Sequence, residues 1–161
     1  MRLTRFTDYS LRVLIALAID PERSVTIQAI AESYGVSNNH LMKIAHQLGR
    51  LGYIETVRGR NGGLRLARDP GEICLGDVVR DCEEDRAIVE CFDPETSTCR
   101  IEPGCTLRHV LEEALSAFFE VLDQYTLADL AERKGKLRSL LGLPPLHRAR
   151  KSPAARGATK H

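Results

Sequence analysis

A basic, glycine-rich stretch decides the fold class of this chain: Val57-Arg58-Gly59-Arg60-Asn61-Gly62-Gly63-Leu64-Arg65-Leu66. Its Asn-Gly pair is a strong signal for the tight turn of a β-hairpin. The residues on either side, 53–57 and 64–66, alternate with the two-residue period of a strand. The stretch therefore predicts a short hairpin whose tip carries a dense positive charge.

Three amphipathic segments precede this hairpin. Apolar residues at helical spacing predict helices over about 7–19, 26–35 and 38–51. Thr7 and Ser37 are in position to cap the first and third helices. The second and third segments are joined by Gly-Val-Ser, and a short turn that contains Gly is typical of a helix-turn-helix. Because a basic hairpin follows directly, we predict a winged helix-turn-helix rather than a helical hairpin inside a bundle.

The predicted winged helix, residues 1–70, points to double-stranded promoter DNA as a partner. In this fold the helix after Ser37 enters the major groove, and the wing grips phosphates or the adjacent minor groove. Asparagine pairs with adenine edges, and arginine neutralises phosphates. The expected DNA contacts are Ser37, Asn38, Asn39, His40, Lys43, Arg58, Arg60, Asn61, Gly62 and Gly63.

Charge is segregated along the chain, although the formal net charge is only +1. Residues 1–70 carry +4, residues 71–135 carry −10 and residues 136–161 carry +7. A basic front is consistent with a polyanion partner, and we expect the basic end to be a disordered tail. The sequence shows no signal-peptide pattern and no apolar run that could span a bilayer. We therefore expect a cytoplasmic protein with no membrane partner.

Five cysteines lie within 32 residues, at positions 74, 82, 91, 99 and 105. An odd number in a reducing compartment argues against a disulfide framework. No helical or strand period persists between Cys82 and Cys105, and a loop of that length is usually functional or disordered. We therefore predict that residues 71–105 form a short helix and a cysteine loop that holds a metal or redox group. Cys74, between two apolar residues, is instead expected to be a small buried side chain.

A strongly helical segment follows, residues 106–135. Its apolar side chains predict one stripe: Leu107, Val110, Leu111, Ala114, Leu115, Phe118, Val121, Leu122 and Tyr125. A stripe of 18 residue steps is roughly 27 Å long, more than a small winged helix can cover alone. We therefore expect a dimerisation helix, and a fold class that is mainly α with a small β-hairpin.

Four separated motifs resemble one family. They are Thr7–Arg12 (TDYSLR), Tyr34–His40 (YGVSNNH), Val57–Leu66 (VRGRNGGLRL) and Asp123–Leu130 (DQYTLADL). In this order they are similar to the winged-helix iron–sulfur regulators, a family that includes the cluster-biogenesis regulator IscR and the nitric-oxide sensor NsrR. The last motif resembles NsrR in particular. The resemblance covers about residues 1–130 and implies a transcriptional repressor, not an enzyme.

The resemblance also implies a homodimer with one iron–sulfur cluster in each subunit, 4Fe-4S in preference to 2Fe-2S. The family's three cysteine ligands match Cys91, Cys99 and Cys105, although seven residues separate the first pair where the family has fewer. Three thiolates leave one ligand of a 4Fe-4S cluster to another group. Asp8 of the partner subunit is expected to supply it, with His109 as the alternative. By the same resemblance, nitric oxide is the signal that releases the repressor from a palindromic promoter site.

Other interpretations of the cysteines stay open on the sequence alone. Structural zinc sites pair ligands at gaps of about two to four residues, so gaps of seven and five disfavour zinc. A thiol switch, a regulator of cluster biogenesis similar to IscR and an iron–sulfur carrier are further alternatives, although a carrier needs no helix-turn-helix. An enzyme with a cysteine nucleophile would need a paired histidine and an oxyanion site, and no motif supplies them.

Overall fold

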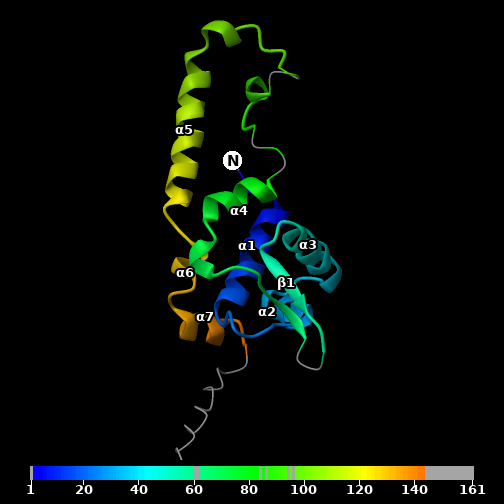
Figure 1. The fold of residues 1–161 in the computed structure, drawn as a ribbon. Coiled ribbons are helices and arrows are strands. Elements are labelled where there is room, and N and C mark those ends of the chain that lie inside the picture. The colour runs from blue at the N-terminus through cyan, green and yellow to red at the C-terminus, as the bar shows by residue number, and fades with distance from the viewer. Residues whose placement is uncertain are drawn as a thin grey trace, which may run out of the picture.

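The computed structural model describes residues 2–59, 62–83, 85, 87–93, 95 and 97–143. The helices are α1 (Arg5–Ala18), α2 (Ile27–Tyr34), α3 (Asn38–Arg50), α4 (Leu75–Cys82), α5 (Thr106–Asp123), α6 (Leu127–Leu130) and α7 (Lys134–Leu140), and the strands are β1 (Ile54–Val57) and β2 (Gly63–Leu66). Figure 1 shows α1, α2, α3 and the strand pair in one body, from which α5 extends as a long helix. The predicted fold class, mainly helical with a small hairpin, is confirmed.

Helix α1 begins earlier than the sequence predicts, because Thr4 and not Thr7 is its N-cap. Thr4 has an extended backbone, and its side-chain oxygen accepts the backbone N–H of Thr7 at 3.2 Å. Thr7 is fully buried in the first turn, where its hydroxyl lies 3.0 Å from that of Thr4. The predicted caps of α2 and α3 are confirmed, since Thr26 and Ser37 each accept a backbone N–H, at 3.1 and 3.3 Å.

One hydrophobic core joins α1, α2, α3 and the hairpin. Its largest fully buried side chains include Leu14, Leu17, Ile30, Ile44, Leu48 and Tyr53. The Tyr53 hydroxyl donates to a carboxylate oxygen of Asp81 at 2.6 Å, which ties this core to α4. Helix α2 ends at Gly35, whose φ of 63° is a left-handed backbone that favours glycine. The tight turn into α3 follows from that glycine.

The strands β1 and β2 are antiparallel, and their register pairs Val57 with Gly63. Val25 extends this sheet through two backbone hydrogen bonds of 2.8 Å with Leu64. A Cβ atom on Gly63 would lie 2.7 Å from the Val25 carbonyl oxygen, which is backbone and has little room to move. Gly63, an expected DNA contact, is therefore required first of all by the packing of the wing against the strand-like segment before α2.

Helix α5 has two apolar faces instead of the single stripe that the sequence predicts. The inner face is half-buried, where Leu111, Leu115, Phe118 and Phe119 line a cavity of about 510 Å³ together with Val79 of α4 and residues 87–89. The outer face of α5 is exposed and comprises Leu107, Val110, Ala114, Ala117 and Val121. No residue of α5 is buried within the protomer. Among the described helices, none is both long and apolar enough to cross a membrane.

After α5 the chain returns to the first body through α6. Leu127 of α6 is fully buried, and its backbone N–H donates to the Ile73 carbonyl at 2.9 Å. Thr126 forms a capping box with Asp129 at the start of this short helix. The segment after α5 is thus held against the strand-like residues that precede α4.

Helix α7 corrects the expectation of disorder from residue 136. Arg138 on this helix lies 3.3 Å from Asp20 at the end of α1, with only 11% and 17% of the two side chains exposed. Leu141, directly after the helix, packs against the hydrophobic core. This ion pair and this apolar contact order residues 134–143, although their basic composition is typical of a tail. The rest of the predicted tail, residues 144–161, lies outside the described residues.

Candidate functional site

The exposed side of α3 carries several of the expected DNA contacts. Asn38, Asn39 and Lys43 are exposed on this helix. Ser37 shapes the start of the helix, because its hydroxyl oxygen accepts the backbone N–H of His40 at 3.3 Å. The His40 ring is partly buried and stands edge-on to the ring of Tyr9, with ring centres 5.2 Å apart. The polar side of α3 is therefore accessible, while His40 also connects it to α1.

Two further residues of α3 share this side and were missed by the sequence reasoning. Met42 and His46 are both exposed, and each follows Asn38 or Asn39 at helical spacing. The signal was available in the sequence, because the buried positions Leu41 and Ile44 already fix which face is turned to the core. Met42 and His46 therefore join the candidate DNA-facing surface.

The wing divides its arginines between solvent and the protein itself. Arg58 is exposed at the end of β1, whereas Arg60 and Asn61 lie outside the described residues. Arg65 forms an ion pair with Glu55 on the opposite strand. Arg68 donates at 3.0 Å to two backbone carbonyls that follow α3, and its guanidinium lies 4.7 Å from the centre of the Tyr53 ring. Arg68 therefore fastens the wing to α3.

Asp8 lies in the first turn of α1, where its carboxylate is engaged by Arg12. One oxygen accepts the Arg12 Nε–H at 3.1 Å, and the other lies 2.9 Å from Nη2. About half of each side chain is exposed, so this ion pair is accessible to solvent. Asp8 is thus available to a second chain only in exchange for its contact with Arg12.

The three cysteines matched to cluster ligands lie on the segment that leads into α5. Cys91 is buried in the short 3-10 helix η2 (Glu90–Phe92), Cys99 is partly exposed, and Cys105 is the N-cap of α5. Burial raises the pKa of the Cys91 thiol, and the nearby Cys99 adds to the increase. All three are free cysteines. Figure 1 shows this segment at the end of α5 that lies away from the winged-helix body.

An ion-pair network holds this segment in place. Arg108, in the first turn of α5, pairs with Glu102 and, at 2.9 Å, with Glu112. The hydroxyl of Ser97 donates to the other oxygen of Glu102 at 2.7 Å. The sequence reasoning missed Arg108, although its charge acts on Cys91 and its side chain borders Cys99. Arg108 therefore positions the loop between the cysteines.

His109, the alternative fourth ligand, lies on the solvent side of the same region. Its side chain is 79% exposed, and its Nδ1 lies 3.5 Å from a carboxylate oxygen of Glu112. With Cys99 it lines an open cavity of about 690 Å³. The structure thus places His109 closer to the cysteine segment than Asp8 of the same protomer, which lies on α1.

These residues suit an iron–sulfur cluster in donor chemistry. Such clusters are held by cysteine thiolates, and the segment supplies three free thiols. Each thiolate of a cluster binds a different iron, so the sulfur atoms are spread more widely than around a single ion. Cys105 adds the N-terminal end of α5, whose partial positive charge is favourable for an anionic group. The segment therefore fits a cluster better than a single metal ion.

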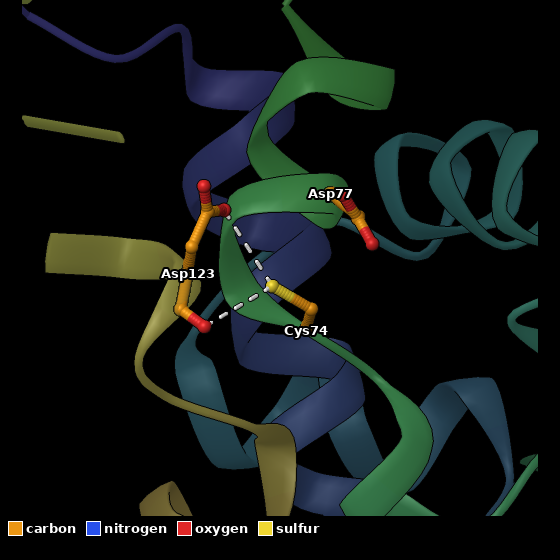
Figure 2. A group of neighbouring side chains, drawn as sticks. All are labelled: Cys74, Asp77 and Asp123. Atoms are coloured by element: carbon orange, nitrogen blue, oxygen red, sulfur yellow. Dashed lines mark hydrogen bonds between the residues drawn. The ribbon is translucent and has the colours of Figure 1, made fainter. Parts of the chain in front are cut away.

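A separate group of ligand atoms lies where α4 meets the end of α5. Figure 2 shows Cys74, Asp77 and Asp123, whose ligand atoms lie within 4.8 Å of one another. Arg80 already occupies Asp123, with a nitrogen 2.7 Å from each carboxylate oxygen, and holds the pKa of that carboxyl below its usual range. Cys74 is partly exposed and lies 3.6 Å from Asp123, so the expectation that it is buried is wrong. The group is best explained as a junction between two helices.

Helix α4 also connects the cysteine segment to α1. Cys82, at its end, is buried, and burial raises the pKa of its thiol. The next residue, Glu83, is a buried carboxylate whose oxygen accepts the backbone N–H of Thr4 at 2.7 Å. Thr4 is the N-cap of α1, which carries Asp8. The beginning of the cysteine segment is thus hydrogen-bonded to the helix that presents the expected fourth ligand.

Known proteins resemble this chain over most of its length. Residues 3–133 match the Rrf2 family model, described as an iron-dependent transcriptional regulator. The chain is 55% identical over 142 residues to the HTH-type transcriptional regulator NsrR of Bacillus subtilis (strain 168), covering 88% of this chain and 97% of that protein. It is 54% identical over 142 residues to NsrR of Geobacillus kaustophilus (strain HTA426), with the same coverage of 88% and 97%. The resemblance to NsrR seen in the sequence is confirmed.

Solved structures agree with these relatives. The fold is similar to that of CymR (YrzC), the global cysteine regulator of B. subtilis, with a TM-score of 0.69, 28% identity, and coverage of 83% of this chain and 98% of that one. T. potens IscR gives a TM-score of 0.68 and 27% identity over 86% of this chain and 91% of that one. The relatives are named as regulators of transcription, not as enzymes. The chain belongs to the Rrf2 family of iron-dependent transcriptional regulators.

Proposed function

We propose that this chain is a nitric-oxide-sensitive repressor that binds a palindromic promoter site as a homodimer and carries one iron–sulfur cluster in each subunit. The observation that carries the proposal is the set of three free thiols, Cys91, Cys99 and Cys105, on the segment that leads into α5. The relatives at 54–55% identity are named NsrR, which supports nitric oxide as the signal. Such a repressor acts in the cytoplasm, where the promoter is accessible.

The three thiolates would hold the cluster, with Asp8 of the partner subunit as the fourth ligand and His109 as the alternative. A bound cluster supplies iron, to which nitric oxide binds strongly. A carboxylate is a harder ligand than thiolate and a weaker one for cluster iron, so the fourth position is the vulnerable one. The hydrogen bond from Thr4 to Glu83, at 2.7 Å, gives the cysteine segment a direct contact with α1 and the DNA-binding domain.

The proposed dimer forms through the outer face of α5. Its members Leu107, Val110 and Val121 are 54–62% exposed, an unusual cost for valine and leucine on a monomer surface. A second copy of the same helix would cover this face along its length. Two winged helices would then be linked, as recognition of two half-sites roughly one DNA turn, 34–36 Å, apart requires.

Two substitutions should separate base recognition from phosphate binding. Asn39→Ala should weaken operator binding by about 1–3 kcal/mol and relax the sequence preference, because asparagine reads base edges. Arg58→Ala should weaken binding to all sequences and lower the salt slope by about one. Gel-shift titrations with operator and scrambled duplexes at several salt concentrations measure both effects. Equal losses for both variants on both duplexes would contradict this division of roles.

The proposed function is tested by visible absorbance of the full chain, purified without oxygen, before and after addition of nitric oxide. We expect iron–sulfur absorbance that changes with nitric oxide, together with release of the promoter duplex in a parallel gel shift. A colourless protein that contains zinc or a disulfide would contradict the proposal. A coloured protein whose DNA binding ignores nitric oxide but follows cluster loss would instead favour the IscR-like alternative.

A further inference from the structure

Arg12 is held at the centre of a charged and aromatic cluster on α1. Its Nε and Nη2 atoms lie 3.1 and 2.9 Å from the two carboxylate oxygens of Asp8. Its guanidinium also lies 5.4 Å from the ring centre of Tyr9 and 5.7 Å from that of Tyr34. Attraction to the two ring faces restricts where the guanidinium can move. Arg12 is therefore a positioned cation rather than a freely moving surface charge.

This cluster borders the DNA-facing surface of α3. The ring of Tyr9 contacts the ring of His40 edge-on, at 5.2 Å, in the first turn of α3. The hydroxyl of Tyr34, the last residue of α2, donates to the Arg12 carbonyl at 3.1 Å. When a recognition helix lies in the major groove, the elements beside its N-terminus cross the phosphate backbone. An arginine at this place is suited to a phosphate contact.

We propose that Arg12 binds a DNA phosphate and that Asp8 controls when Arg12 is available. While the Asp8 carboxylate pairs with Arg12, the guanidinium is neutralised and adds little to DNA affinity. The inference rests on the proposed function in one respect, because Asp8 is also the proposed ligand to the cluster of the partner subunit. Ligation takes at least one carboxylate oxygen away from Arg12. Cluster binding then releases the cation that DNA needs, and cluster loss restores the ion pair.

The strength of the ion pair permits this exchange. The Arg12 and Asp8 side chains are 43% and 47% exposed, and a pair this exposed shifts an equilibrium by about fivefold or less. A ligand or a substitution can overcome an effect of that size. The two tyrosine rings meanwhile keep the released guanidinium close to α3, so that little further ordering is required before it meets a phosphate.

The experiment compares the full-length parent, Asp8→Asn, Arg12→Gln and the double variant, all freed of cluster. Fluorescence anisotropy measures their binding to a short mixed-sequence DNA duplex over a series of salt concentrations. Asp8→Asn should bind about three- to fivefold more tightly than the parent. Its plot of log affinity against log salt should be steeper by about 0.9, the contribution of one phosphate contact. In the Arg12→Gln background, Asp8→Asn should change neither quantity.

Tighter binding of Asp8→Asn that persists in the Arg12→Gln background would overturn the inference, because the Asp8 charge would then act on DNA directly. Glu32→Gln is the matched control, since it removes an exposed carboxylate that contacts Gln28 at 2.8 Å on α2 and should leave the slope unchanged. The absorbance of the reconstituted parent is measured separately. A colourless parent with an Arg12-dependent slope would overturn the proposed function alone.

Discussion

Cys91→Ala, Cys99→Ala and Cys105→Ala proteins, each purified without oxygen, should lack iron–sulfur absorbance and lose operator affinity. Each variant removes one of only three thiolates on the segment before α5, and a cluster held by two has no replacement thiol nearby in the described loop. Affinity should fall on the order of 10³-fold, toward the level of non-specific binding. Absorbance, iron content and gel-shift titration on the same samples measure the result.

Cys74→Ala is the matched control for these variants. Cys74 is also a free and partly exposed cysteine, but its sulfur lies at the α4–α5 junction, 3.6 Å from Asp123. The control should keep both the absorbance and the affinity. If a Cys91 or Cys105 variant retained full absorbance, the assigned ligand set would be wrong.

Val110→Asp and Val121→Asp should each turn the dimer into a monomer. Both residues are exposed on the outer face of α5, at 54% and 55%, and a charge buried in a dimer seam without a partner is costly. A monomer loses the linkage between half-sites, so operator affinity should fall by about 10²-fold or more. Light scattering gives the mass, and a gel shift gives the affinity.

Leu140→Asp provides the comparison for this experiment, because it places the same charge at a leucine that is 72% exposed on α7. It should leave the mass and the DNA affinity unchanged. Phe118→Asp should behave differently again, since Phe118 is half-buried against the chain's own residues 87–89 and its loss acts on the fold of the protomer. Dimers that persist in both valine variants would exclude the outer face as the interface.

Local signals in the sequence were sufficient for the winged helix. Gly35 and Ser37 mark the turn between α2 and α3, and the Asn61-Gly62 pair marks the wing, because each requires a particular backbone or a particular cap. The cap of α1 was misplaced, since Thr4 and Thr7 are equally suited by type. Only the burial of Thr7 distinguishes between them, and burial depends on the tertiary fold.

Contacts between distant segments could not be predicted. The apolar positions of α5 read as one stripe, and only the approach of residues 87–89 divides them into an inner and an outer face. The wing arginines looked equivalent, yet Arg68 is drawn to carbonyls at the end of α3. The pairing of Arg138 with Asp20 joins residues far apart in the sequence, so composition alone suggested a disordered end.

The lack of any buried side chain on α5 bears on how the protein folds. An isolated helix of 18 residues is only marginally stable in water, so much of the order of α5 must come from a second copy. The melting temperature should then rise with protein concentration, because association and folding are linked by mass action. A promoter that gathers two protomers on adjacent half-sites would raise their local concentration, and the operator would thereby assist the folding of its own repressor.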